Sequence, residues 1–230
     1  MNRVRSFFAF VLVLPSLALR VQAAAPFAED FNAGTANWRF SNSIELDPVP
    51  VGGPDGSGYV SRTFAFASLS NPAADAATIF RAQDEYNSSG VAYAGNWITE
   101  GVKRVSAFVR HTAPEPLSFT VRLANPANFP GASYLSTAPV PPGVWTKIAF
   151  NVTPSSPQNL TYEATSYNTV FSNVGHMQFG VSIPESLRGG ATPYAFDLDR
   201  VRVSNVPEPA ACGLAALALA SLSAFIRNTR

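Results

Sequence analysis

The chain has 230 residues and a formal net charge of +1, with 13% charged and 47% hydrophobic residues. This near-neutral balance argues against the strongly basic classes of protein that bind nucleic acids or anionic membrane surfaces. The one cysteine, Cys212, cannot form an intrachain disulfide, so the fold must depend on a hydrophobic core.

The first residues are typical of a secretory signal peptide. Arg3 and Arg5 precede an apolar run over 7–19, and small residues follow up to Ala23, which is the order of n-region, h-region and cleavage site. The apolar run is too short to span a bilayer comfortably and has no single apolar stripe, which disfavours an amphipathic helix. We therefore expect residues 1–23 to be removed by a signal peptidase and the remainder to be exported.

Strand patterns recur through the central segment, and no long helical periodicity interrupts them. Apolar and polar residues alternate with period two, which indicates strands with one buried face. In chain order the weaker candidates are 44–46, 59–64 and 78–81, and the stronger ones are 105–109, 117–123, 146–152 and 177–183.

Clusters of glycine and proline separate these candidate strands. They occur at 52–58, 113–116, 139–143 and 189–190. Short strands with such punctuation are typical of antiparallel sandwiches or barrels, and not of parallel α/β folds. The sequence therefore predicts an all-β fold, an antiparallel β-sandwich of the jelly-roll type, as one exported domain over residues 24–205.

Aromatic residues offer candidates for carbohydrate contact, which usually requires exposed rings beside polar groups. Trp38 and Trp145 adjoin strand patterns, so we assign both to the core. Five further rings lie in polar or glycine-rich surroundings, and each is either a sugar platform or a packing residue. These candidates for glycan contact are Tyr86, Tyr93, Trp97, Phe129 and Tyr134.

Residues suited to catalysis are sparse in the central segment. His111 and His176 lack the short spacing of a metal motif, so His176 is interpreted as a packed or edge residue. The sequence has no Gly-x-Ser-x-Gly elbow, and the central segment has no thiol nucleophile. A glycosidase needs two facing carboxylates, and sequence cannot place an acidic pair such as Asp84 and Glu85 across a cleft. The sequence thus favours a protein that is not an enzyme.

The last candidate strand changes register once. Phe196 and Leu198 share one face in period two, whereas Val201 and Val203 have the opposite parity. A single slip within a buried strand predicts a β-bulge just after Asp199, and a bulge redirects side chains. We expect Asp199 to be a carboxylate tilted inward at the edge of the sheet.

The C-terminal part contains a second apolar segment. Residues 210–226 carry no charge and are followed by Arg227 and Arg230. This length is just sufficient for a single transmembrane helix, with the arginines in the cytoplasm and the preceding domain outside. A buried core helix is the alternative, which is disfavoured because a helix after a strand would have no neighbouring helix to pack on.

The apolar segment is preceded by Val206, Pro207, Glu208 and Pro209 and followed by the basic tip. With this order the tail over residues 206–230 resembles the PEP-CTERM sorting signal of Gram-negative envelope proteins. Each position of the Pro-Glu-Pro core matches the motif. The resemblance implies recognition by an exosortase, a membrane transpeptidase-like enzyme. It also implies transient anchoring in the inner membrane, then delivery to the cell surface or exopolysaccharide matrix.

Several further features are spread along the exported segment, at 27–31, Trp38, 53–59, 142–145 and 196–201. With these residues the segment resembles jelly-roll modules of the carbohydrate-binding and galactose-binding-like type. Many such modules hold a structural calcium between the first and last strands, where hard oxygen ligands gather. The resemblance implies Glu29 or Asp30 as the first ligand and Asp199 as the second. Solvated carboxylates, or a salt bridge with Arg200 or Arg202, are the alternatives.

These features together predict a non-enzymatic exported surface or extracellular-matrix protein. One alternative is a lectin-like module that binds a defined glycan, and another is a polysaccharide-active enzyme. The expected partners are signal peptidase, an exosortase, the membrane through the C-terminal helix, and a polysaccharide.

Overall fold

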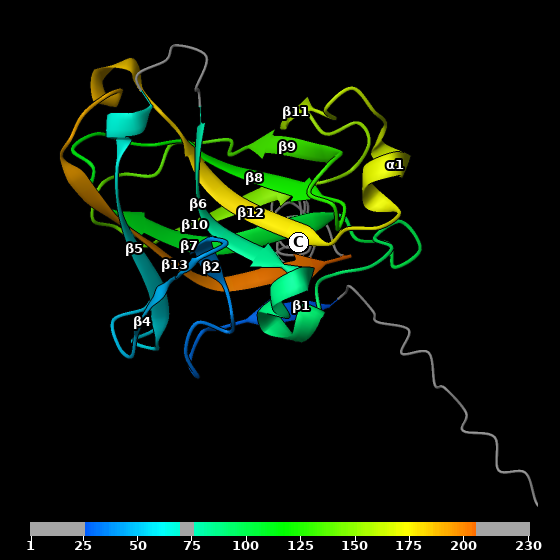
Figure 1. Cartoon of the computed structure of the whole chain (residues 1–230), viewed down its shortest axis with the longest axis horizontal. Coiled ribbons are helices and arrows are strands. Elements are labelled where there is room, and N and C mark those ends of the chain that lie inside the picture. The colour runs from blue at the N-terminus through cyan, green and yellow to red at the C-terminus, as the bar shows by residue number, and fades with distance from the viewer. Residues whose placement is uncertain (1–25, 70–75, 206–230) are drawn as a thin grey trace, which may run out of the picture.

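The computed structural model of the protein describes residues 26–69 and 76–205 (Figure 1). The predicted signal peptide, the sorting motif at 206–209 and the apolar segment at 210–226 lie outside the described residues. Within the described ranges, no helix combines the length and the apolar character that crossing a bilayer requires.

The described residues form two sheets, of which sheet A contains the last strand of the domain. Its strand order is β10-β7-β13-β5-β4, and β1 also pairs with β13. The strands are β10 (Thr146–Asn151), β7 (Arg104–His111), β13 (Pro193–Ser204), β5 (Tyr59–Ala65), β4 (Asp47–Val49) and β1 (Phe27–Glu29).

Sheet B forms the second layer, with the order β11-β9-β8-β12-β6-β2-β3. Every strand pairing in both sheets is antiparallel, which confirms the predicted all-β antiparallel sandwich. The strands are β11 (Asn159–Thr161), β9 (Gly131–Leu135), β8 (Phe119–Ala124), β12 (His176–Ser182), β6 (Ala76–Gln83), β2 (Arg39–Ser41) and β3 (Ile44–Glu45).

Helical turns are short and lie between strands. Helix α1 (Tyr167–Phe171) begins after Ser166, whose Oγ accepts a hydrogen bond from the backbone N–H of Thr169. Two 3₁₀ turns directly follow β6 and lie at the end of sheet B where β12 begins (Figure 1). The 3₁₀ turns are η1 (Phe66–Ser68), η2 (Asp84–Tyr86), η3 (Ser88–Val91) and η4 (Glu185–Leu187).

The hydrophobic core lies between the two sheets and accounts for the alternating sequence pattern. Val105, Ala107 and Val109 of β7 are buried on one face, as the period-two pattern predicts. Across the sandwich, the rings of Phe150 in β10 and Phe179 in β12 have centroids 6.3 Å apart. The inner faces of the two sheets thus supply the apolar burial that stabilises the fold.

Strand β13 contains the predicted bulge. Its pairing with β7 shifts register between Asp199 and Arg202, and Arg200 has φ of 50°. The predicted position at a sheet edge is wrong, because β13 pairs with β7 on one side and with β5 and then β1 on the other. Pairing with β5 ends at Leu198 and pairing with β1 starts at Val201, so Asp199 lies where two partner strands meet.

The two tryptophans that we assigned to the core differ in environment. Trp38 is fully buried, and its Nε1 donates to Ser89 Oγ at 2.8 Å. Trp145 is only half-buried, and its Nε1 donates to the backbone oxygen of Gly52 at 2.8 Å. The core prediction is therefore wrong for Trp145, because its ring packs beside the Arg110 guanidinium, 4.7 Å from the ring centroid, on the outer side of sheet A.

Candidate functional site

A row of polar side chains crosses the outer face of sheet B. Residues directly opposite each other on neighbouring strands share a face, so consecutive cross-strand pairs place their side chains next to one another. Their neighbours along the central strands belong to the core, which identifies this face as the outer one. The row consists of Ser133 (β9), Arg122 (β8), Gln178 (β12), Arg81 (β6) and Arg39 (β2).

Arg122 is held by a carboxylate from the loop after β11. Its Nε lies 2.5 Å from Oε1 of Glu163 and its Nη2 lies 2.8 Å from Oε2, a bidentate pair. Hydrogen bonds from Arg122, followed by its positive charge, hold the pKa of Glu163 below its usual range against the opposing effect of burial. The guanidinium also donates to Asn128 Oδ1 at 2.8 Å, so Arg122 is both compensated and fixed in orientation.

Arg39 is compensated at the opposite end of the row. Its Nη2 lies 3.1 Å from Glu45 Oε1. Its guanidinium carbon lies 4.3 Å from the centroid of the half-buried Tyr86 ring, which is a cation–π contact. The structure therefore places Tyr86, one of the predicted glycan-contact residues, beside this row.

Arg81 lies between these two compensated arginines. Its Nε donates to the backbone oxygen of Phe40 at 2.7 Å, and no carboxylate among the described residues forms an ion pair with it. Burial and, secondarily, the positive charge of Arg122 lower the pKa of Arg81. Since a guanidinium stays protonated in proteins, this shift indicates a charge that is partly desolvated and repelled by its neighbour.

Two buried glutamines lie next to the arginines. Gln178 is satisfied, since its Nε2 donates to Asn128 Oδ1 at 2.9 Å and its Oε1 accepts from Arg122 at 3.3 Å. Gln83 donates from Nε2 to Glu85 Oε1 at 2.8 Å, but its buried Oε1 has no hydrogen-bond partner within the described part of the chain. Leaving a buried acceptor unpaired costs about 1–3 kcal/mol.

Three of the predicted glycan-contact aromatics are core residues. Tyr93, Trp97 and Tyr134 are fully buried, so none exposes a ring face to a sugar, and the platform prediction is wrong for them. Tyr93 Oη donates to the backbone oxygen of Gly175 at 2.9 Å. The rings of Trp97 and Tyr134 pack on Phe171 of α1, with centroids 5.8 and 6.3 Å away, because α1 covers this end of the sandwich.

The remaining two candidates, Phe129 and Tyr86, lie beside the polar row, on its side toward the start of β12. Phe129 is 63% exposed and follows Asn128, whose Oδ1 accepts from Arg122 and Gln178. Tyr86 lies in η2, directly after β6. The end of β6 and the end of β8 both pair with the start of β12, so the loops with these two rings flank the same end of sheet B.

The structure does not gather the predicted calcium ligands into one cluster. Among the described residues, Glu29, Asp30 and Asp199 do not form a set of ligand atoms within 4.8 Å of one another. Glu29 Oε2 accepts from Ser89 Oγ at 2.8 Å, and Asp30 Oδ1 lies 2.5 Å from Arg202 Nη2, which is the salt bridge left open by the sequence. Calcium binding stays a prediction.

Asp199 is nevertheless fully buried, under the loop 53–58. Its Oδ1 accepts from the backbone N–H of Arg200 at 2.6 Å, and its Oδ2 accepts from Ser57 Oγ at 3.3 Å. Burial raises the pKa of Asp199 to about 6, and the negative charge of Asp30 adds to this effect. Desolvation of an acid disfavours its ionised form, so the bulge holds a carboxyl group under electrostatic strain.

A cluster that sequence reasoning missed lies beside the polar row. His176 Nε2 is 2.9 Å from Glu85 Oε2 and 3.5 Å from Asp84 Oδ1. The sequence shows no motif because the acids follow β6 and the histidine starts β12. Antiparallel pairing of Gln83 with His176 brings the three side chains together. The sequence alone does not show how β6 and β12 are paired, so it could not reveal this cluster.

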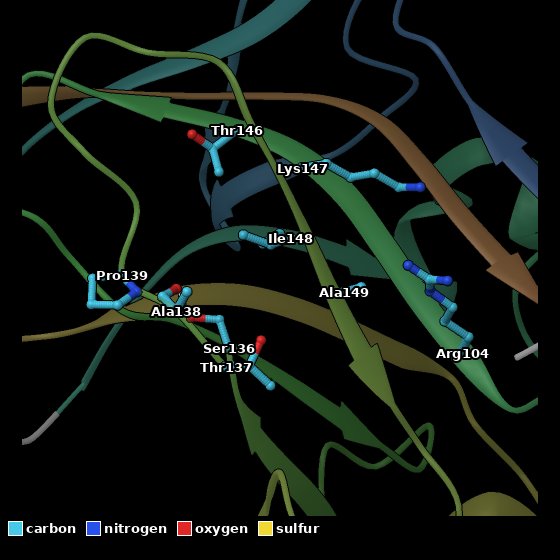
Figure 2. Close-up of a pocket in the computed structure, with 9 residues that line it drawn as sticks. All are labelled: Arg104, Ser136, Thr137, Ala138, Pro139, Thr146, Lys147, Ile148 and Ala149. Carbon is cyan, nitrogen blue, oxygen red and sulfur yellow. Dashed lines mark hydrogen bonds between the residues drawn. The ribbon is translucent and has the colours of Figure 1, made fainter. Parts of the chain in front are cut away.

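A separate hollow lies at the β10 edge of sheet A, and Figure 2 shows its lining. Its volume is about 170 Å³, below the roughly 300–1,000 Å³ of typical small-molecule pockets. Small side chains dominate the lining, which makes this hollow a weaker candidate than the outer face of sheet B. The hollow is lined by residues 136–139 and 146–149 and by Arg104.

No protein-family model and no curated protein sequence matches the chain. Among solved structures, the chain is similar to the CBM22-1 and GH10 modules of xylanase 10B from Clostridium thermocellum, a structure complexed with xylohexaose. The two chains share 14% identity with a TM-score of 0.46, and the match covers 79% of this chain and 28% of that one. An exo-β-agarase gives 10% identity and a TM-score of 0.48, over 77% and 24% of the two chains. The chain therefore spans less than a third of each of these two structures.

A third similar structure is the CBM22-1 xylan-binding domain of Xyn10C from Paenibacillus barcinonensis. It shares 14% identity with a TM-score of 0.42, over 77% of this chain and 92% of that domain. At these values the likeness concerns the course of the chain and says nothing of the residues on the outer face of sheet B.

Proposed function

We propose that the protein is an exported module that binds an acidic glycan across the outer face of sheet B. The observation that carries this proposal is the position of Arg81, a partly desolvated guanidinium with no carboxylate partner among the described residues. A carboxylate or sulfate on a sugar would supply the missing counter-charge through two parallel hydrogen bonds.

The surroundings of Arg81 suit a sugar chain better than a simple anion. The Tyr86 and Phe129 rings lie beside the two ends of the row, near Arg39 and Arg122 respectively, and Phe129 is 63% exposed. Arg122 and Gln178 are already fixed by hydrogen bonds to Asn128. A ligand would therefore meet a largely pre-organised surface and would lose little affinity to side-chain ordering.

Export is the second part of the proposal, and its support comes from the sequence of the two ends. The signal-peptide pattern at 1–23 and the PEP-CTERM resemblance at 206–230 favour an envelope or matrix protein that an exosortase processes. Mass spectrometry of the mature protein, purified from its own cells, tests this part. New termini close to Ala23 and to the Pro-Glu-Pro motif are expected, and an intact chain in the cytosol would overturn it.

The binding experiment uses the full-length chain in detergent and a panel of glycans. Polygalacturonate represents uronate-bearing chains, and xylan and β-1,4-galactan represent neutral chains. We expect binding to the acidic glycan, weakened about tenfold or more by Arg81→Gln, because a charge-assisted contact is lost. Arg202→Gln removes the same charge from sheet A, where Arg202 pairs with Asp30, and should leave the affinity unchanged.

Other outcomes assign other functions. Binding to neutral glycans alone, unaffected by Arg81→Gln, would replace the acidic ligand with a neutral one. Turnover of a bound polysaccharide would favour an enzyme. Absence of binding to a broad glycan array would overturn the proposal and favour a surface protein without a sugar ligand.

A further inference from the structure

Three potential metal ligands converge at one end of sheet B, outside the row that contains Arg81. The ligand atoms of Asp84, Glu85 and His176 all lie within 4.8 Å of one another, and among the described residues no other group of three or more such side chains does so. The acids lie in η2 and the histidine begins β12, so the cluster is built on regular backbone and not on a long loop.

The hydrogen bonds around His176 determine which ring nitrogen faces the acids. Nδ1 lies 3.1 Å from Asn128 Oδ1, and that oxygen already accepts from Arg122 and Gln178. Since Asn128 Oδ1 acts as an acceptor, Nδ1 must carry a proton and donate it. In a neutral imidazole the lone pair is therefore on Nε2, the nitrogen nearest Glu85 and Asp84.

This arrangement lacks a cation. His176 is 1% exposed, and its Nε2 has no hydrogen-bond partner among the described residues, although Glu85 Oε2 lies 2.9 Å away. A lone pair and two carboxylates directed at one point repel one another unless a positive charge lies between them. A proton bound within the cluster or a metal ion supplies that charge.

The distances suit a small metal ion. Zinc binds histidine nitrogen and carboxylate oxygen at about 2.0–2.2 Å in tetrahedral geometry, which separates two ligand atoms by roughly 3.4 Å. The observed separations from Nε2 are 2.9 Å to Glu85 and 3.5 Å to Asp84. Shifts of a few tenths of an ångström, available to the 44% exposed Glu85 side chain, would complete three ligand positions.

We propose that Asp84, Glu85 and His176 bind a divalent transition-metal ion of the zinc class, with Asn128 as the residue that orients His176. An imidazole ligand favours zinc over calcium, which takes six to eight oxygens. A histidine that ligates a metal usually donates its other N–H to an oxygen, as His176 does to Asn128. Three protein ligands leave a fourth position open at the exposed side of the cluster.

The backbone supports this site independently of any metal. Asp84 N–H donates to the oxygen of Gly175 at 3.1 Å, which ties η2 to the residue before His176. A Cβ at Gly175 would lie 2.9 Å from Asp84 Oδ2, so the glycine allows this close approach. The acids are therefore held near the histidine by the fold, and metal binding would need little rearrangement.

The experiment titrates the metal-free full-length chain with Zn²⁺ against a chromophoric chelator, with Co²⁺ as a spectroscopic probe. We expect one high-affinity ion per chain and a Co²⁺ d–d spectrum typical of four-coordination. Glu85→Gln keeps the size of an exposed side chain and should weaken binding about tenfold or more, and His176→Gln should do the same. Glu185→Gln changes a matched exposed acid at the other end of β12 and should have no effect.

Failure is distinguishable from failure of the glycan proposal. No stoichiometric Zn²⁺ binding by the unmutated chain would overturn the metal site and leave a proton within the cluster as the source of positive charge. Equal Zn²⁺ binding by the unmutated chain and Glu85→Gln would also overturn it, by moving the ion elsewhere, for example to Cys212. Glycan binding by the metal-free chain is measured separately and depends on Arg81.

Discussion

Arg122 and Glu163 face each other side-on across the edge of the polar row, with Nε–Oε1 and Nη2–Oε2 separations of 2.5 and 2.8 Å. Glu163 also accepts from the backbone N–H of Gly131 at 2.8 Å. The pair therefore fastens the loop after β11 to two strands of sheet B, and it fixes one arginine of the proposed glycan site.

Replacing Glu163 with glutamine tests this pair. The folded-state pKa of Glu163 lies below its ordinary 4.5, so the stabilisation is complete above about pH 4.5 and is lost as the pH falls through the folded value. We expect Glu163→Gln to lower the free energy of unfolding by about 1–2 kcal/mol at pH 7 and by much less at pH 3. Urea denaturation at both pH values measures this, and an equal loss at both would contradict the ionic contribution.

Asp199 should give the opposite pH dependence. Its pKa is raised from 3.8 to about 6 in the folded protein, so its neutral form is favoured by folding. The ionised Asp199 carboxylate destabilises the folded state. This destabilisation is absent below about pH 4, grows between about pH 4 and 6, and is constant at higher pH. In chelator, Asp199→Asn should therefore stabilise the protein at pH 8 by up to about 3 kcal/mol. The gain should disappear near pH 3.5, and a gain that is independent of pH would contradict the assigned cause.

If calcium binds as predicted, an ionised Asp199 stabilises the folded protein in the presence of the ion and does not destabilise it. If Asp199 is a ligand, the melting temperature of the unmutated chain rises with added calcium and falls in chelator, because a ligand that binds only the folded state stabilises it. Asp199→Ala should remove the response, whereas Glu85→Gln should retain it. A melting temperature that ignores calcium in the unmutated chain would end this prediction.

Aromatic substitutions should separate core residues from surface residues. Trp97 is fully buried, so Trp97→Ala should cost about 3–5 kcal/mol of stability. Phe129 is 63% exposed, so Phe129→Ala should change stability by no more than about 0.5 kcal/mol. Denaturant titration of both variants provides the comparison, and similar losses would show that burial does not distinguish the two rings.

The sequence determined the fold class through local periodicity. Strands such as Phe119–Ala124 and Thr146–Asn151 alternate between buried and more exposed residues, and period two reports that burial directly. The bulge near Asp199 was predictable for the same reason, since a slip of one residue reverses the parity of the apolar positions. Short strands such as Phe27–Glu29 and Asp47–Val49 contain too few residues to show a period.

The candidate sites depended on information that no local pattern contains. The polar row exists because five strands pair in one register, and the metal cluster exists because Gln83 pairs with His176. The sequence also gave no measure of burial. Trp97 and Phe129 were equally good candidates for glycan contact in the sequence, whereas in the structure Trp97 is buried and Phe129 is exposed. Local spacing of residues decides which face of a strand is apolar. Only the pairing of strands decides which polar residues lie together on the other face, because paired strands bring together residues that are distant along the chain.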